Sequence, residues 1–251
     1  MPVHIAASYA FFPLSEEETV ALQQELSAFG EERKMKGLVL IAEEGINSTV
    51  CGSQQAIAQW KARIRQLHPE MVFKDSTAEG EVFRRWSVKV KKEIVTLRKP
   101  GIRPQGTHKH LSPAAWNEML QDKDAVVIDA RNTFEVAIGK FRGAVDPGIR
   151  YFHQFPDFVR ASNLPKDQKV LLYCTGGIRC EKAVLAMEAE GYENVYQLDG
   201  GILKYLEQFP EREFEGECFV FDHRVAVDQQ LQPSKTFILD PVTGDPCRVG
   251  R

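Results

Sequence analysis

A cysteine placed between a buried strand and a helix is the feature that most limits how this chain folds. The apolar run 170–173 predicts a strand, and the alanine-rich, glycine-free segment 181–189 lies within an apparent helix from Cys180 to Glu190. The residues that begin at Cys174 therefore form a loop at the entrance of a helix. A strand that leads through a short loop into a helix is typical of an α/β fold.

The composition of this loop is that of an anion-binding site. Its two glycines let the backbone curl so that successive N–H groups converge, and the helix N-terminus adds positive charge. A thiol in such a field has a lowered pKa, and an arginine stabilises the thiolate. We interpret Cys174 as a nucleophile, whereas the alternative is an inert, buried thiol in an ordinary turn. The loop consists of Cys174, Thr175, Gly176, Gly177, Ile178 and Arg179.

Length and composition set the frame for the rest of the chain. The 251 residues, of which 43% are hydrophobic and 27% charged, suffice for one large domain or two modest ones. The five scattered cysteines form no secreted disulfide pattern and no metal-binding pair. No apolar run reaches the length of a membrane span, and the start lacks the pattern of a signal peptide. We therefore expect a cytoplasmic protein with reduced thiols, no metal and no membrane partner.

The first hundred residues alternate strand and helix patterns in the order of a split βαβ unit. A capping box of Ser15 and Glu18 marks the start of the first helix, and Ser53 is a plausible cap for the second. This order predicts a ferredoxin-like (acylphosphatase-like) domain. Strands are expected at 3–12, 37–42, 46–50 and within 83–97, and helices at 15–29 and 53–67.

A local excess of positive charge lies between residues 84 and 109, although the whole chain carries a net charge of −3. Lysine and arginine neutralise phosphates, and an exposed aromatic such as Trp86 can stack on an RNA base. The alternative is a solvated strand face with Trp86 in the core. The sequence leaves both interpretations open. The candidate RNA-binding residues, called here the basic stripe, are Arg84, Arg85, Lys89, Lys91 and Lys92.

The second half predicts an α/β domain with a parallel sheet, after a linker rich in proline and glycine. Asp129, Arg131 and Cys174 all follow apolar runs, so they are expected at the carboxyl ends of strands, where ligands bind in such sheets. We interpret Asp129, Arg131 and Glu135 as partners that orient the loop rather than as chemical acids. The predicted division is a ferredoxin-like domain at 1–98, a linker at 99–112, the α/β domain at 113–210 and a C-terminal extension at 211–251.

Four motifs of the second half occur in an order that resembles a rhodanese domain. They are Asp129-Ala130-Arg131 with Glu135, the segment 139–144, the loop 174–179 and the segment 191–202. The resemblance implies a domain that carries sulfur as a cysteine persulfide or uses the same thiol for related chemistry. Lys140 stands where rhodaneses usually have histidine. The six-residue loop is similar to that of sulfurtransferases, and a phosphatase is disfavoured because rhodanese-like phosphatases have a longer loop.

The whole chain resembles the rhodanese-containing tRNA uridine hydroxylases. The match rests on the ferredoxin-like first domain with its segment 42–47, on 174–182 and on 216–225. It implies oxygen-dependent conversion of the wobble uridine 34, in the anticodon region of tRNA, to 5-hydroxyuridine. Molecular oxygen is then a co-substrate, and no other cofactor is identified. Ser48 is a mild departure, since the family motif often continues there with glycine.

Several roles stay open at this point. Cys174 is a nucleophile that attacks C6 of uracil or a persulfide carrier. Cys180 is a candidate resolving thiol or a small packed residue at the start of the helix. Cys218 lies among apolar residues, so we expect it to be buried. Two other functions compete with the hydroxylase, namely a thiosulfate-type sulfurtransferase with a cysteine persulfide and a noncatalytic RNA-binding adaptor.

Overall fold

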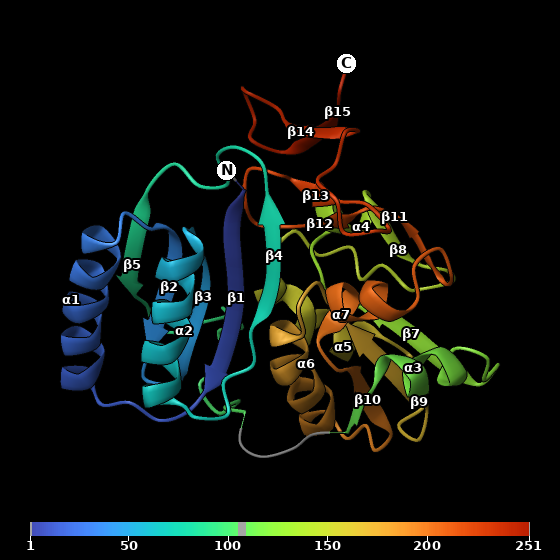
Figure 1. Cartoon of the computed structure of the whole chain (residues 1–251). Helices are drawn as coiled ribbons and strands as arrows, with labels where there is room; N and C mark the ends of the chain where they lie inside the picture. Colours follow the sequence, from blue (N-terminus) through green and yellow to red (C-terminus); the bar gives the residue numbers. More distant parts are fainter. Residues whose placement is uncertain (1, 105–108, 251) are drawn as a thin grey trace. The chain divides into compact units, whose positions relative to one another are not determined.

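The computed structural model describes residues 2–104 and 109–250, and it divides the chain into two units, residues 1–96 and 97–251 (Figure 1). Part of the predicted linker 99–112, residues 105–108, lies outside the described residues. The domain boundaries drawn from the sequence stay a prediction. Each unit has its own sheet and its own apolar core.

The first unit is a five-stranded sheet in the order β4-β1-β3-β2-β5. The four strands β4, β1, β3 and β2 pair antiparallel in the ferredoxin-like order, and β5 adds to β2 in parallel. The predicted ferredoxin-like fold is confirmed. Its elements are β1 (Val3–Phe11), α1 (Glu16–Glu32), β2 (Lys36–Ala42), β3 (Gly45–Gly52), α2 (Gln54–Leu67), β4 (Lys74–Ala78) and β5 (Trp86–Val90).

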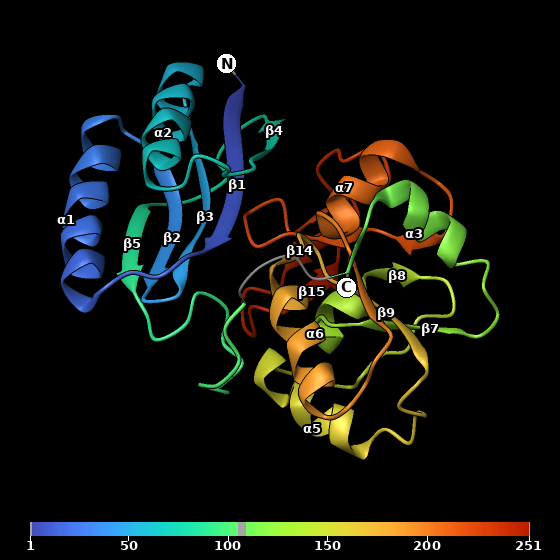
Figure 2. The same cartoon turned by 90° about the horizontal axis from the view of Figure 1, so that it is seen from below.

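Both helices of this unit begin where their caps predict. Ser15 Oγ accepts a hydrogen bond from the Glu18 N–H at 3.2 Å, and the Glu18 carboxylate accepts one from the Ser15 N–H at 2.7 Å. Ser53 caps α2 by accepting from the Ala56 N–H at 3.2 Å. The two helices cover the same face of the sheet (Figure 2), so their apolar stripes and the strands enclose one core around Trp60.

The prediction of the fourth strand within 83–97 is wrong. The fourth strand of the fold is β4, which pairs with β1, and the region 83–97 contributes only the five-residue β5. The sequence of β4 is Lys-Asp-Ser-Thr-Ala, and only Ala78 of it is buried. An edge strand with so little apolar surface carries no alternation that a sequence pattern can detect.

The second unit contains a parallel sheet in the order β6-β10-β9-β7, as predicted. Helix α6 follows β9 directly, which places the loop 174–177 at the carboxyl end of that strand. The elements are β6 (His110–Leu111), α3 (Pro113–Met119), β7 (Ala125–Asp129), α4 (Thr133–Val136), β8 (Gly139–Phe141), the 3₁₀ helix Phe152–Gln154, α5 (Phe155–Ala161), β9 (Lys169–Tyr173), α6 (Ile178–Ala189), β10 (Val195–Leu198) and α7 (Gly201–Gln208).

The segment predicted as a C-terminal extension packs into this same unit. Strand β11 (Phe214–Gly216) pairs antiparallel with β8, and the Phe214 ring lies 5.4 Å from that of Phe141 in the core. Its remaining strands are β12 (Cys218–Phe219), β13 (Ala226–Val227), β14 (Phe237–Leu239) and β15 (Pro246–Arg248). Two further short strand pairs lie in this segment, β12 with β13 and β14 with β15.

Candidate active site

The loop that carries Cys174 turns its backbone N–H groups toward the sulfur. Gly177 has φ 101°, a left-handed conformation that favours glycine, and it caps the N-terminus of α6. Its N–H donates a hydrogen bond to Cys174 Sγ at 3.1 Å. The positive end of the α6 dipole points at the same place. The sequence-based prediction of an anion-binding turn therefore matches the geometry.

The carbonyl groups of the loop are held by helix α7. The N–H of Ile202 donates to the Cys174 carbonyl at 3.0 Å, and the N–H of Leu203 donates to the Thr175 carbonyl at 3.2 Å. This close approach requires Gly201, because a Cβ at that position would lie 2.4 Å from the Cys174 carbonyl oxygen. Gly201 also has φ +66°, so any side chain there would be strained as well as crowded.

Cys174 is completely buried, and its surroundings favour the thiolate. Burial alone raises the pKa, but the hydrogen bond from the Cys180 thiol, the charge of Arg179 and the backbone N–H groups of Arg179 and Cys180 together lower the pKa to about 5. The pKa of Cys180 moves the other way, because burial and the adjacent Cys174 sulfur both raise it. Cys180 therefore stays protonated, and its thiol donates a hydrogen bond to the Cys174 sulfur. Both cysteines are free in this structure, and the resolving role of Cys180 stays a prediction.

The lowered pKa predicts how fast Cys174 reacts with an alkylating agent at different pH values. Only the thiolate reacts, so the rate of modification by iodoacetamide should be almost constant from pH 8 to pH 6 and halve near pH 5. Mass spectrometry of the modified peptide measures this rate. A rate that still rises tenfold per pH unit above pH 7 would contradict the assignment, because it would show an ordinary thiol.

Glu135 and Arg179 form a buried ion pair beside the loop. Two nitrogens of the Arg179 guanidinium donate to the two Glu135 oxygens at 2.5 and 2.7 Å, and the Thr175 hydroxyl lies 3.3 Å from Oε1. Burial raises the pKa of Glu135, but the charge and hydrogen bonds of Arg179 lower it by more. The net pKa is therefore below its usual value, and the carboxylate stays ionised. The pair holds the guanidinium whose charge lowers the pKa of Cys174, and the role of Glu135 as an orienting partner stays a prediction.

Asp129 and Arg131 form a second buried ion pair, at the end of β7. Arg131 donates from Nε and from one terminal nitrogen to the Asp129 carboxylate at 2.8 and 2.6 Å, and its terminal nitrogen also donates to the Gly139 carbonyl at 2.6 Å. Both side chains are fully buried. The pair links the end of β7 to β8, and its role in orienting the loop stays a prediction.

Two further positions have structural surroundings. Cys218 is buried, as predicted, and burial raises its pKa to about 12, so it stays a neutral thiol. Lys140 donates from Nζ to the Ala144 carbonyl at 3.1 Å. The departure from histidine at this position therefore changes a contact within the scaffold.

All five residues of the basic stripe are exposed, on β5 and the segments at its two ends. Trp86, which lies between them in the sequence, is part of the core instead. Its Nε1 donates to the Leu26 carbonyl at 3.2 Å, and its ring meets that of Trp60 at 5.7 Å. These contacts favour the alternative in which Trp86 packs against the core, whereas the charges remain available to phosphates.

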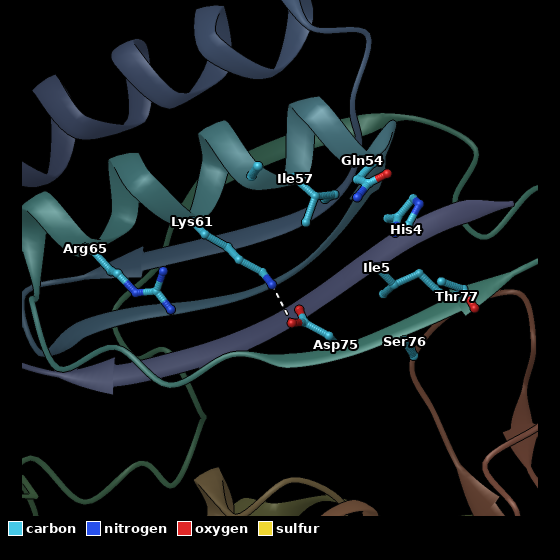
Figure 3. Close-up of a pocket in the computed structure, with 10 residues that line it drawn as sticks. His4, Ile5, Gln54, Ile57, Lys61, Arg65, Asp75, Ser76 and Thr77 are labelled. Atoms are coloured by element: carbon cyan, nitrogen blue, oxygen red, sulfur yellow. Dashed lines mark hydrogen bonds and ion pairs between the residues drawn. The ribbon is translucent and has the colours of Figure 1, made fainter.

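A groove of about 580 Å³ opens on the first unit, between α2 and the strands β1 and β4 (Figure 3). Lys61 and Asp75 form an ion pair across it, and Arg65 lies at one end. The lining contains no cysteine, so this groove is a different site from the Cys174 loop. Its residues are His4, Ile5, Gln54, Ile57, Ala58, Lys61, Arg65, Asp75, Ser76 and Thr77.

Comparison with known proteins identifies both units. Residues 3–94 match the family model described as UPF0176 acylphosphatase like domain, and residues 112–208 match the rhodanese-like domain. A protein from Bdellovibrio bacteriovorus named tRNA uridine(34) hydroxylase is 47% identical, over 98% of this chain and 71% of its own length. The chain belongs to the tRNA uridine(34) hydroxylase family. Proteins of the same name from Gluconobacter oxydans and Rhizobium etli are 44% and 47% identical, and each match covers 92% of this chain and 76% of the relative.

Membership of the tRNA uridine(34) hydroxylase family agrees with the resemblance read from the loop and the segments around it. Among residues 2–104 and 109–250, no helix is long and apolar enough to cross a membrane. The same residues contain no group of three or more side chains arranged to bind a metal ion. The roles of the individual site residues stay predictions.

One residue near the loop was missed in the sequence. Phe221 follows β12, and 60% of its surface is exposed, whereas Phe219 two positions earlier is buried. The apolar residues Phe-Val-Phe after Cys218 predict only that Cys218 is buried. In a regular strand residues 219 and 221 would lie on the same face, but β12 ends at Phe219, so a period of two does not predict that one ring is buried and the other exposed.

Proposed function

We propose that this protein hydroxylates C5 of uridine 34 in the anticodon of tRNA, in the cytoplasm, with Cys174 as the nucleophile. The single observation that carries the mechanism is the Cys174 sulfur, which has a pKa of about 5 and is therefore a thiolate at neutral pH. The substrate comes from the names of relatives that are 44–47% identical over nearly the whole chain.

The thiolate makes C5 of uracil reactive by adding to C6. That carbon is electrophilic because the C5–C6 double bond is conjugated with the C4 carbonyl. When the C6–S bond forms, the π electrons move toward C5 and the C4 oxygen, and the resulting enolate is a nucleophile at C5. After an oxygen atom has bonded to C5, loss of the C5 proton and cleavage of the C6–S bond restore the aromatic ring and the thiolate.

The oxygen atom comes, in this proposal, from molecular oxygen. The balanced reaction combines uridine, O₂, two electrons and two protons to give 5-hydroxyuridine and water, so a two-electron reductant is a further reactant. Arg179 and the N–H groups of the loop stabilise the negative charge on sulfur as the bond breaks. These residues act on the sulfur atom.

The base must enter the loop to reach this sulfur. Cys174 has no exposed surface, while Gly176 and Ile178 of the same loop are partly exposed. A target base inside a folded RNA has to leave its stack before such an enzyme can act on it. We infer that uridine 34 is extruded from the anticodon loop and enters at the side of Gly176 and Ile178.

The basic stripe supplies a surface for the tRNA backbone. Its five exposed cations lie on one edge strand and its flanks, and each phosphate contact by such a residue makes binding more dependent on salt. We propose that the stripe binds phosphates of the tRNA and contributes affinity without reading the base.

Deletion of the gene in its host tests the proposed function. Nucleosides from the tRNA of the deleted strain should lack 5-hydroxyuridine and the derivatives made from it, and expression of the intact chain should restore them. Liquid chromatography with mass spectrometry measures both. Unchanged 5-hydroxyuridine in the deleted strain, with no second gene of this family present, would rule the function out.

A thiosulfate-type sulfurtransferase is the second candidate, because the same N–H groups that hold a thiolate also hold the terminal sulfur of a persulfide. In that case Cys174 should take the outer sulfur of thiosulfate, with release of sulfite, and pass it from the persulfide to a thiol acceptor, while the tRNA is unaffected. Thiosulfate turnover without a change in tRNA nucleosides favours this candidate over the hydroxylase.

A further inference from the structure

An exposed aromatic ring stands beside the catalytic loop. Phe221 is 60% exposed, and the Arg179 guanidinium lies over its ring at 5.7 Å from the ring centroid. The backbone N–H of Arg179 also donates to Cys174. Arg179 therefore contacts the reacting sulfur with its backbone and the Phe221 ring with its side chain, which places the ring within one arginine side chain of the thiol.

The Phe221 ring packs at the end of a row of aromatic rings. Its ring meets that of Phe219 edge to face at 5.0 Å, and Phe219 meets Phe134 in the same way at 5.1 Å. Phe134 belongs to α4, the helix that carries Glu135, and the Phe219 carbonyl lies 3.4 Å from the Thr175 hydroxyl. Phe219 thus connects the Phe221 ring to Thr175 of the loop, and Phe134 connects it to the helix that carries Glu135.

The turn that presents the ring is tightly held. The Val220 N–H donates to the Val225 carbonyl at 2.9 Å, and Arg224 donates to both carboxylate oxygens of Asp222 at 2.9 and 2.6 Å. Val225 adopts φ +62°, a left-handed conformation that is unfavourable for a β-branched residue. Backbone strain of this kind concentrates at functional sites. The residues on both sides of Phe221 are thus held in one turn.

We propose that Phe221 and Arg179 form a stacking site for the uracil ring of the extruded uridine at the entrance to the Cys174 loop. The inference rests on the proposed function and adds the residue that receives the base. A flat pyrimidine stacks on an aromatic side chain whatever its substituents, and each such contact is worth about 1–3 kcal/mol.

Replacement of Phe221 by alanine tests the stacking directly. The dissociation constant of a labelled anticodon stem-loop with uridine at position 34 should rise about 5- to 150-fold, because one base contact is lost. The variants Phe221→Tyr and Phe221→Trp keep a ring and should bind within about 3-fold of the intact protein. The matched control is Tyr151→Ala, which removes another aromatic side chain of the second unit that is 53% exposed and should leave binding unchanged.

An RNA change separates stacking on the base from an indirect effect. The same stem-loop with an abasic site at position 34 has no ring to stack, so Phe221→Ala should weaken its binding less than about 2-fold. Iodoacetamide modification of Cys174 in the variant should retain its midpoint near pH 5, which shows that Arg179 and the loop are intact.

Two results would overturn the inference. One is binding of the uridine stem-loop by Phe221→Ala within 2-fold of the intact protein. The other is an equal loss for the uridine and abasic stem-loops, which would mean that the ring acts through the fold or the RNA backbone. Failure of the proposed function is a different outcome, because the intact protein would then form no 5-hydroxyuridine.

Discussion

Replacing Cys174 by serine is expected to reduce the hydroxylation of tRNA by at least about 10³-fold, because a serine hydroxyl stays protonated where the cysteine is a thiolate. The variant should still bind tRNA, since the basic stripe lies on the other unit. Mass spectrometry of nucleosides from tRNA treated with the purified variant measures the loss, and fluorescence anisotropy measures the binding.

Cys247→Ser is the matched control for this experiment. Cys247 lies in β15 and is half-buried, so the same chemical change there should leave hydroxylation intact. The complementary variant reverses the charges of Arg84 and Arg85 to glutamate, which should weaken tRNA binding and its salt dependence while the thiol stays reactive. Full modification of tRNA by Cys174→Ser would contradict the nucleophile assignment. If the intact protein formed no 5-hydroxyuridine while the charge reversal still weakened RNA binding, the noncatalytic adaptor would be favoured.

Replacing Glu135 by alanine should lower the free energy of unfolding by about 3–5 kcal/mol, since it leaves the Arg179 guanidinium buried without its counter-charge. The side chains of Arg179 and Glu135 are 7% and 0% exposed, so water cannot replace the lost carboxylate. Urea unfolding measures the difference. Hydroxylation should fall as well, because Arg179 is no longer fixed next to the sulfur.

Glu188→Ala on α6 provides the comparison for this loss. Glu188 is exposed, so its removal should change stability by less than about 0.5 kcal/mol. The pH dependence gives an independent check. Arg179 lowers the pKa of Glu135 in the folded state, so the stabilisation by this pair is complete above the unfolded pKa and decreases as the pH falls below it. Equal urea midpoints for the Glu135→Ala and intact proteins would contradict the importance of the pair.

The sequence predicts the geometry of the Cys174 loop well because the residues that determine it are neighbours along the chain. The apolar run before Cys174, the two glycines and the helix after them are adjacent along the chain, and the structure places them as one strand, turn and helix. The capping box of Ser15 is equally local. Patterns of this kind depend on backbone geometry that neighbouring residues determine.

Features that depend on distant residues could not be predicted in the same way. Strand β4 is a strand because it pairs with β1, some seventy residues earlier, and its own residues are mostly polar. Trp86 is in the core because Leu26 and Trp60 lie around it. Phe221 gains its position from a turn and an aromatic row whose members are far apart in the sequence. Each of these is a property of tertiary packing, which overrides local preference.

Helix α7 binds carbonyl groups of the Cys174 loop, and this contact affects the electrostatic field at the sulfur. Every peptide group of the loop has a negative end as well as a positive one, and a carbonyl oxygen turned toward the thiolate would cancel the effect of the N–H groups. The N–H groups of Ile202 and Leu203 hold the Cys174 and Thr175 oxygens against α7, an approach that only a bare Gly201 permits. The helix thereby orients the peptide groups of the loop, so that the sulfur faces the positive ends of their dipoles.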